Sequence, residues 1–125
     1  NLLHIGDCIL YIEYLRGNEA VVKKLTDLYK KGEKLCYSPV TMAEIIAGLR
    51  KGEEEITSSL FNLMECFKIG EDIGHKAGEY MKKFRASHTI EIADALIAAT
   101  VCTYGASLWT FNRKHYPMKD IEFYV

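Results

Sequence analysis

Short apolar runs alternate with longer helix-like stretches along the whole chain, and this alternation constrains the fold more than any other feature. The runs with strand character are residues 2–5, 34–38, 65–69, 107–110 and 121–125. The stretches with helical spacing are residues 8–17, 19–31, 39–52, 53–64, 71–86 and 90–105. Alternating strands and helices favour a parallel sheet covered by helices on both faces. We therefore predict an α/β fold of three layers, α/β/α, with a central parallel sheet of four to five strands.

Local signals predict where the helices begin and end. Three of them are followed at once by glycine, the residue favoured just past a helix end: Gly17, Gly32 and Gly105. Ser38 and Pro39 supply a cap and a proline at the first helical position, and that helix is expected to continue to about Gly52. Thr89 is expected to cap the last helix.

Length and composition predict one globular domain over residues 1–125. No apolar stretch approaches the roughly 20 residues that span a membrane, and there is no signal-peptide pattern. The formal charge of −1 does not indicate a nucleic-acid binder, although an acidic site would cancel a local basic patch. The four cysteines have no C-x-x-C spacing, which argues against a zinc site and favours buried free thiols in a reducing cytoplasm: Cys8, Cys36, Cys66 and Cys102.

Four acid or amide residues stand at or just beyond the junctions between predicted strands and helices: Asp7, Glu44, Asp94 and Asn112. Because ligands bind beyond the carboxyl ends of parallel strands, we expect these side chains to converge at one edge of the sheet. A carboxylate beside a core is costly unless it is paired or holds a metal. Carboxylate and amide oxygens suit Mg²⁺ or Mn²⁺. The sequence therefore predicts a divalent-cation site at this edge.

Each of these residues also has a structural interpretation that the sequence leaves open. Asp7 can cap the following helix, and Asn112 can form a turn. Glu44 can be an ordinary helical acid, although the apolar residues beside it, including Ile46, are expected to belong to the core. Asp94 gives the strongest signal, because its helix is apolar on nearly all sides and a helix of that kind is buried.

Further residues are secondary candidates. Glu91 can share a helix face with Asp94, and Glu13 lies six residues past Asp7; each is either a further ligand or a solvated charge. Thr110 either hydrogen-bonds a ligand or ends a strand. Four basic residues near helix ends and in the last loop are candidates for substrate binding, unless they are simply solvated, with Tyr116 available to stack on a base: Arg16, Arg113, Lys114 and His115.

The chain resembles PIN-domain nucleases, and in particular the VapC-type toxin ribonucleases. "GDCILYIEYLRG", "YSPVTMAEIIAGLR", "IADALIAAT" and "LWTFNRKHY" resemble, in order, the four sequence blocks of that family over nearly the whole chain. By position, Asp7, Glu44 and Asp94 correspond to the three acids of the family's metal site, and Asn112 takes the fourth position. The chain departs from the pattern at Cys8, where threonine is usual, and at Asn112, where many relatives have aspartate.

The resemblance implies a PIN-like fold and a Mg²⁺- or Mn²⁺-dependent endoribonuclease, in which Asp7, Glu44, Asp94 and Asn112 are both catalytic and metal-binding. It further implies the toxin of a toxin–antitoxin pair, with RNA as substrate, a small antitoxin protein as partner and a homodimeric assembly. Two alternatives keep the fold: a housekeeping RNA-processing nuclease, and a non-catalytic module that binds RNA or protein. A third is an unrelated α/β protein with an acidic pocket, such as a receiver domain.

Overall fold

The structure of the chain, a computed structural model, describes residues 3–124. Strands and helices alternate in the predicted order. The first half comprises β1 (Leu3–Gly6), α1 (Cys8–Leu15), α2 (Glu19–Lys30), β2 (Lys34–Tyr37), α3 (Pro39–Ala47) and α4 (Glu54–Leu63). The second half comprises β3 (Glu65–Cys66), α5 (Glu71–Phe84), α6 (Ile92–Tyr104), β4 (Ser107–Trp109), the 3₁₀ turn η1 (Arg113–His115) and β5 (Glu122–Phe123).

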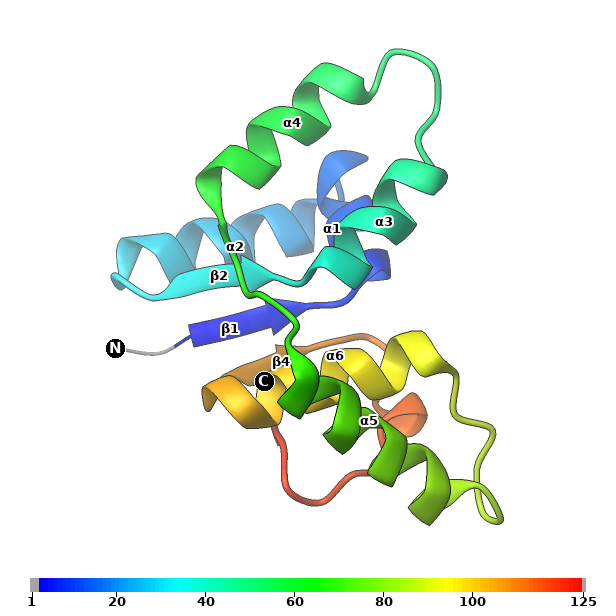
Figure 1. The fold of residues 1–125 in the computed structure, drawn as a ribbon. Helices are drawn as coiled ribbons and strands as arrows, with labels where there is room; N and C mark the ends of the chain where they lie inside the picture. The colour runs from blue at the N-terminus through cyan, green and yellow to red at the C-terminus, as the bar shows by residue number, and fades with distance from the viewer. Residues whose placement is uncertain (1–2, 125) are drawn as a thin grey trace.

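The described strands form one parallel sheet in the order β3-β2-β1-β4-β5. Helices α1 to α4 lie on one side of the sheet, and α5 and α6 lie on the other (Figure 1). Each side has its own apolar core, one including Leu10, Leu28 and Ile45, and the other including Ile73 and Ile97. The predicted three-layer α/β/α fold with a parallel sheet is confirmed. Leu2 and Val125, which the prediction included in the outer strands, lie outside the described residues.

Two predicted helix boundaries are wrong. Helix α3 ends at Ala47 with Gly48 as its C-cap, well before Gly52. The residues that follow form a separate turn, in which the Arg50 N–H donates to Glu53 Oε1 at 2.7 Å. Helix α6 begins at Ile92 with Glu91 at the N-cap position, so Thr89 does not cap it. The chain stays non-helical between Thr89 and Glu91, where Ile90 packs against the core beside α5 and α6.

The cysteines are all free, as predicted, but they are not all buried. Cys36 is buried on β2, Cys8 and Cys102 are partly buried, and Cys66 is exposed. Cys66 lies on β3, an edge strand, which has a neighbouring strand on one side only. Among residues 3–124, no helix combines the length and apolar character needed to cross a membrane.

The carboxyl end of β1 is packed tightly against the first turns of α1. The Gly6 N–H donates to the Tyr11 hydroxyl at 2.9 Å, and that hydroxyl donates to the Cys36 carbonyl on β2. A Cβ atom added at Gly6 would lie 2.5 Å from Leu10 Cδ2 and 2.8 Å from Tyr11 Cζ. Only glycine fits there, and this close approach fixes the position of the next residue, Asp7.

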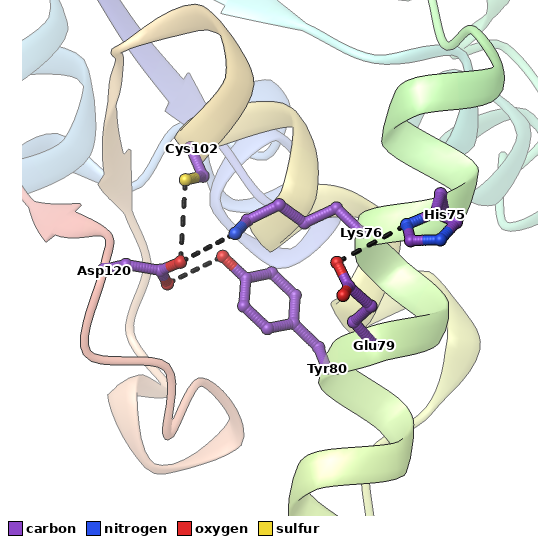
Figure 2. A network of polar contacts seen from close by, with 6 residues as sticks. All are labelled: His75, Lys76, Glu79, Tyr80, Cys102 and Asp120. Atoms are coloured by element: carbon purple, nitrogen blue, oxygen red, sulfur yellow. Dashed lines mark hydrogen bonds and ion pairs between the residues drawn. The ribbon is translucent and has the colours of Figure 1, made fainter.

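The segment after η1 is held to α5 and α6 by Asp120 (Figure 2). Its carboxylate accepts from the Tyr80 hydroxyl at 2.7 Å and pairs with Lys76 Nζ at 2.9 Å, and the Cys102 thiol lies 3.7 Å away. Burial alone would raise the pKa of Asp120, but the hydrogen bonds from Tyr80 and Lys76 outweigh it and lower the pKa below its ordinary value. This network anchors the end of the loop that begins at β4.

Candidate active site

The residues predicted to converge line one pocket at the carboxyl edge of the sheet. Asp7, Glu44, Asp94 and Asn112 all contribute to its wall, together with Glu91. The pocket lies where the strand order reverses, because β2 and β4 flank β1 on opposite sides. Such a reversal leaves a crevice between the loops that follow the two strands, and this is the usual ligand site of an open α/β sheet.

Asp7 is buried and both of its carboxylate oxygens are used. Oδ1 accepts from the Leu10 N–H at 2.9 Å and so caps α1, while Oδ2 accepts from the Thr110 hydroxyl at 2.5 Å. The same Thr110 hydroxyl accepts the N–H of Asn112 at 3.0 Å. Asp7 is therefore both a helix cap and a pocket residue, and Thr110 joins the end of β1 to the end of β4.

Replacing Thr110 with valine removes this join without changing the shape of the side chain. The Asp7 carboxylate then loses one of its two hydrogen bonds in a buried position, which costs about 1–3 kcal/mol. We expect urea denaturation to show a loss of unfolding free energy of that size. Thr110→Ser keeps the hydroxyl and should stay close to wild type. Equal stability of the valine and serine variants would contradict a structural role for the hydroxyl.

Glu44 reaches the pocket from the exposed side of α3. The expectation that core residues surround it is wrong in part, because Ile45 is buried but Ile46 is 54% exposed. Partial desolvation raises the pKa of Glu44 most, and the charge of Asp94 raises it further. Hydrogen bonding from the Cys8 thiol lowers this pKa but offsets the increase only in part.

Asp94 stands in the first turn of α6, and its carboxylate is destabilised by its surroundings. Burial raises its pKa most, and the charge of Glu91 adds to this, while His115 and a hydrogen bond from Tyr116 lower it. Burial and the nearby charges of Glu44 and Asp7 also raise the pKa of Cys8, to about 12, so its thiol stays neutral at physiological pH. The pocket therefore concentrates negative charge that its own residues compensate poorly.

Tyr116 has a role that the sequence did not indicate. Its side chain is only 4% exposed, so the ring is not available to stack on a base. Its hydroxyl donates to Asp94 Oδ1 at 3.4 Å. Burial raises the pKa of Tyr116, as do the charges of Asp7 and Asp94, so the hydroxyl remains a donor.

The secondary candidates separate into two groups. Glu91 and His115 line the pocket, and Arg113 and Lys114 share the short η1 turn with His115. Glu13 and Arg16 do not line it. Glu13 accepts a hydrogen bond from Asn18 at 3.4 Å, and Arg16, at the far end of α1, pairs with Glu53 at 3.7 Å.

The donor set fits a hard divalent cation that keeps part of its water shell. No three His, Cys, Asp or Glu side chains of residues 3–124 are arranged as a closed metal site. Mg²⁺ does not need one, because it usually binds through one or two carboxylates and retains several waters. The cavity of about 210 Å³ has room for such a hydrated ion. Burial raises the pKa values of Glu44 and Asp94 most, and a cation would offset the like-charge repulsion that adds to it.

Comparisons with known proteins agree with this fold. The sequence profile of the PIN domain family matches residues 8–121. Ribonuclease VapC19 of Mycobacterium tuberculosis is 33% identical over 113 residues, which are 90% of each chain. The solved structure of VapBC2 from Rickettsia felis, bound to a DNA fragment from its promoter, matches with a TM-score of 0.84 at 18% identity over 98% of each chain. A toxin–antitoxin complex from Klebsiella pneumoniae matches with a TM-score of 0.79 at 19% identity over 94% of each chain. The chain belongs to the PIN domain family.

Proposed function

We propose that this protein is a metal-dependent endoribonuclease that hydrolyses RNA phosphodiester bonds at the acidic pocket. The observation that carries the proposal is the convergence of Asp7, Glu44 and Asp94 in one pocket at the carboxyl edge of a PIN-domain sheet. A curated relative covering 90% of the chain is named a ribonuclease, which supports RNA as the substrate.

In this proposal Asp7, Glu44, Asp94 and Asn112 would hold Mg²⁺ or Mn²⁺. The bound ion would supply a more acidic water molecule and a positive charge that stabilises the phosphate oxygens. The chain's own residues hold the ligands in place. The Leu10 N–H and the Thr110 hydroxyl orient the Asp7 carboxylate, and the Tyr116 hydroxyl orients Asp94.

The residues around the acids have separate tasks. Asn112 contributes a neutral amide oxygen, so the site carries one negative charge fewer than a site with four acids would. Arg113 and Lys114 place cationic groups on the same turn as His115, beside the pocket, where they can attract the phosphates of RNA.

We further propose that the protein is the toxin of a toxin–antitoxin pair, with a small antitoxin as partner and a homodimeric assembly. The structural similarity to a toxin–antitoxin complex supports this assignment. We assign residues 1–125 to a single PIN-like domain, since the family profile spans residues 8–121. The four free cysteines favour action in a reducing cytoplasm.

Cleavage of a labelled pool of structured RNA tests this function. We expect cutting in Mg²⁺ or Mn²⁺ and none in EDTA, because the carboxylates alone cannot activate the attacking water. The protein must first be freed of any antitoxin and shown to be folded. Failure of such protein to cut under every metal condition would favour a non-catalytic RNA- or protein-binding module.

Metal binding can be measured independently of cleavage. A cation that binds only the folded state stabilises it by about 2.7 kcal/mol at a hundredfold excess over Kd. We expect Mn²⁺ to raise the melting temperature of the wild type and to have little effect on Asp94→Asn. Equal Mn²⁺ shifts in the two proteins would place the ion outside the pocket.

A further inference from the structure

Three exposed apolar residues lie close in the chain to residues that line the pocket. Ile9 in the first turn of α1 is 44% exposed, and Ile92 at the start of α6 is 64% exposed. Phe111, in the loop between β4 and η1, is 52% exposed. Phe111 lies between Thr110, which bonds Asp7, and Asn112, which lines the pocket. Ile9 lines the pocket itself, and Ile92 and Phe111 are each next in the chain to a residue that lines it.

The exposure of Phe111 is not explained by the fold. The other two aromatic residues of this stretch, Trp109 and Tyr116, are each only 4% exposed and belong to the two apolar cores. Phe111 belongs to neither core. Its backbone is nevertheless fixed, because the residues on both sides of it are joined through the Thr110 hydroxyl. The loop therefore presents an aromatic ring to solvent from a defined backbone position between Thr110 and Asn112.

Cationic residues follow Phe111 two and three positions along the chain. Arg113 lies over the Phe123 ring at 4.8 Å, forms no ion pair with any carboxylate of residues 3–124, and is exposed, as is Lys114. An aromatic face next to positive charge matches a nucleotide, whose base has a flat apolar face and whose phosphate is anionic. An apolar segment of a partner protein would contact the Phe111 ring but would have no group to pair with the nearby cations.

We propose that Phe111 is a substrate-binding residue whose ring stacks on a base adjacent to the phosphodiester bond held at the acidic pocket. This rests on the proposed ribonuclease function and adds a positioning contact that the metal site does not provide. A base stacked on Phe111 must have at least one face that no neighbouring base covers, as the unstacked bases of a single strand do. The contact therefore helps to choose which bond of the RNA reaches the acids.

The test compares Phe111→Ala and Phe111→Trp in RNA binding and in cleavage. Binding is measured by fluorescence anisotropy in the Asp94→Asn background, which prevents cutting, with a short unstructured RNA and with the same strand annealed to its complement. Loss of one stacked base costs about 1–3 kcal/mol, so Phe111→Ala should weaken binding of the unpaired strand by about 5- to 150-fold. Binding of the annealed strand should change far less.

Cleavage kinetics supply a second readout. With Asp94 intact, Phe111→Ala should raise KM for the unstructured RNA and leave kcat little changed, while Phe111→Trp should restore the wild-type KM. Ile56→Ala is the matched control, because Ile56 is also about half exposed but lies on α4, none of whose residues lines the pocket. It should behave as wild type in both assays.

The outcomes distinguish failure of the proposed role of Phe111 from failure of the proposed ribonuclease function on which it rests. If the wild-type protein cuts RNA but Phe111→Ala changes neither RNA binding nor KM, the role of Phe111 is overturned and the proposed ribonuclease function stands. If Phe111→Ala loses self-association but keeps its RNA affinity, the ring belongs to a protein interface. That outcome would also overturn the RNA-binding role of Phe111. A wild-type protein that neither binds nor cuts RNA would overturn the proposed function, and the role of Phe111 with it.

Discussion

Asp94→Asn is expected to reduce RNA cleavage by more than about a hundredfold while leaving the fold at least as stable as the wild type. Loss of a residue that only supports a metal ligand already costs about 10- to 100-fold, and Asp94 is placed as a ligand itself. The asparagine oxygen can still accept the hydrogen bond from Tyr116. Initial cleavage rates and melting temperatures of the two purified proteins check both halves of this expectation. A variant that loses activity because it unfolds would not support the assignment.

The same substitution should change how stability depends on pH in the metal-free protein. The pKa of Asp94 is raised above its ordinary value of 3.8, chiefly by burial, so the folded state binds this proton more tightly than the unfolded state does. The stability that protonated Asp94 contributes to the folded state is fully present below pH 3.8. It is lost as the pH rises through the pKa of Asp94 in the folded state. In EDTA, the free energy of unfolding of Asp94→Asn should therefore rise relative to that of the wild type as the pH increases through that window. A difference in unfolding free energy between the two proteins that does not vary with pH would contradict this expectation.

Gly6→Ala is expected to destabilise the protein by about 1–3 kcal/mol, the usual cost of forcing an extra methyl group into a packed core. The new Cβ would lie 2.5 Å from Leu10 Cδ2 and 2.8 Å from Tyr11 Cζ, so the first turns of α1 must move. Because Asp7 follows directly, RNA cleavage should fall as well. Urea denaturation gives the loss in unfolding free energy.

Gly78→Ala is the matched control for that substitution. Gly78 lies inside α5, and nothing stands within 4 Å of an added Cβ. Alanine in a helix interior is more stable than glycine by about 0.5–1 kcal/mol, so this variant should gain stability and keep full activity. If both variants lost stability alike, the tight packing at the end of β1 would not be the cause.

The type and order of the helices and strands were predictable because each has its own local pattern. Apolar runs are separated by capping residues, and Gly17, Gly32 and Gly105 do adopt positive φ angles after their helices. The errors lie where tertiary packing overrides a local signal. Thr89 has a capping side chain, but α6 starts three residues later because the intervening Ile90 packs against the core.

The acids of the site were predictable in sequence because each is near the carboxyl end of a strand or in an early helical turn. Their convergence depended on a strand order that the sequence does not specify, with β4 placed next to β1. Tyr116 was misassigned to the surface, because a tyrosine in a polar loop gives no sign that its ring is buried and its hydroxyl faces Asp94. The exposure of Ile46 and Phe111 likewise depends on neighbours distant in the chain.

The most direct test of the acidic pocket as the catalytic site is RNA cleavage in Mn²⁺ by four proteins measured side by side. They are the wild type, Asp94→Asn, Glu44→Gln and Glu79→Gln, the last of which removes an exposed acid of α5 that does not line the pocket. We expect the wild type and Glu79→Gln to cut at equal rates and to stop in EDTA, and both pocket variants to be inactive although folded. Cutting by Asp94→Asn at the wild-type rate would contradict the assignment.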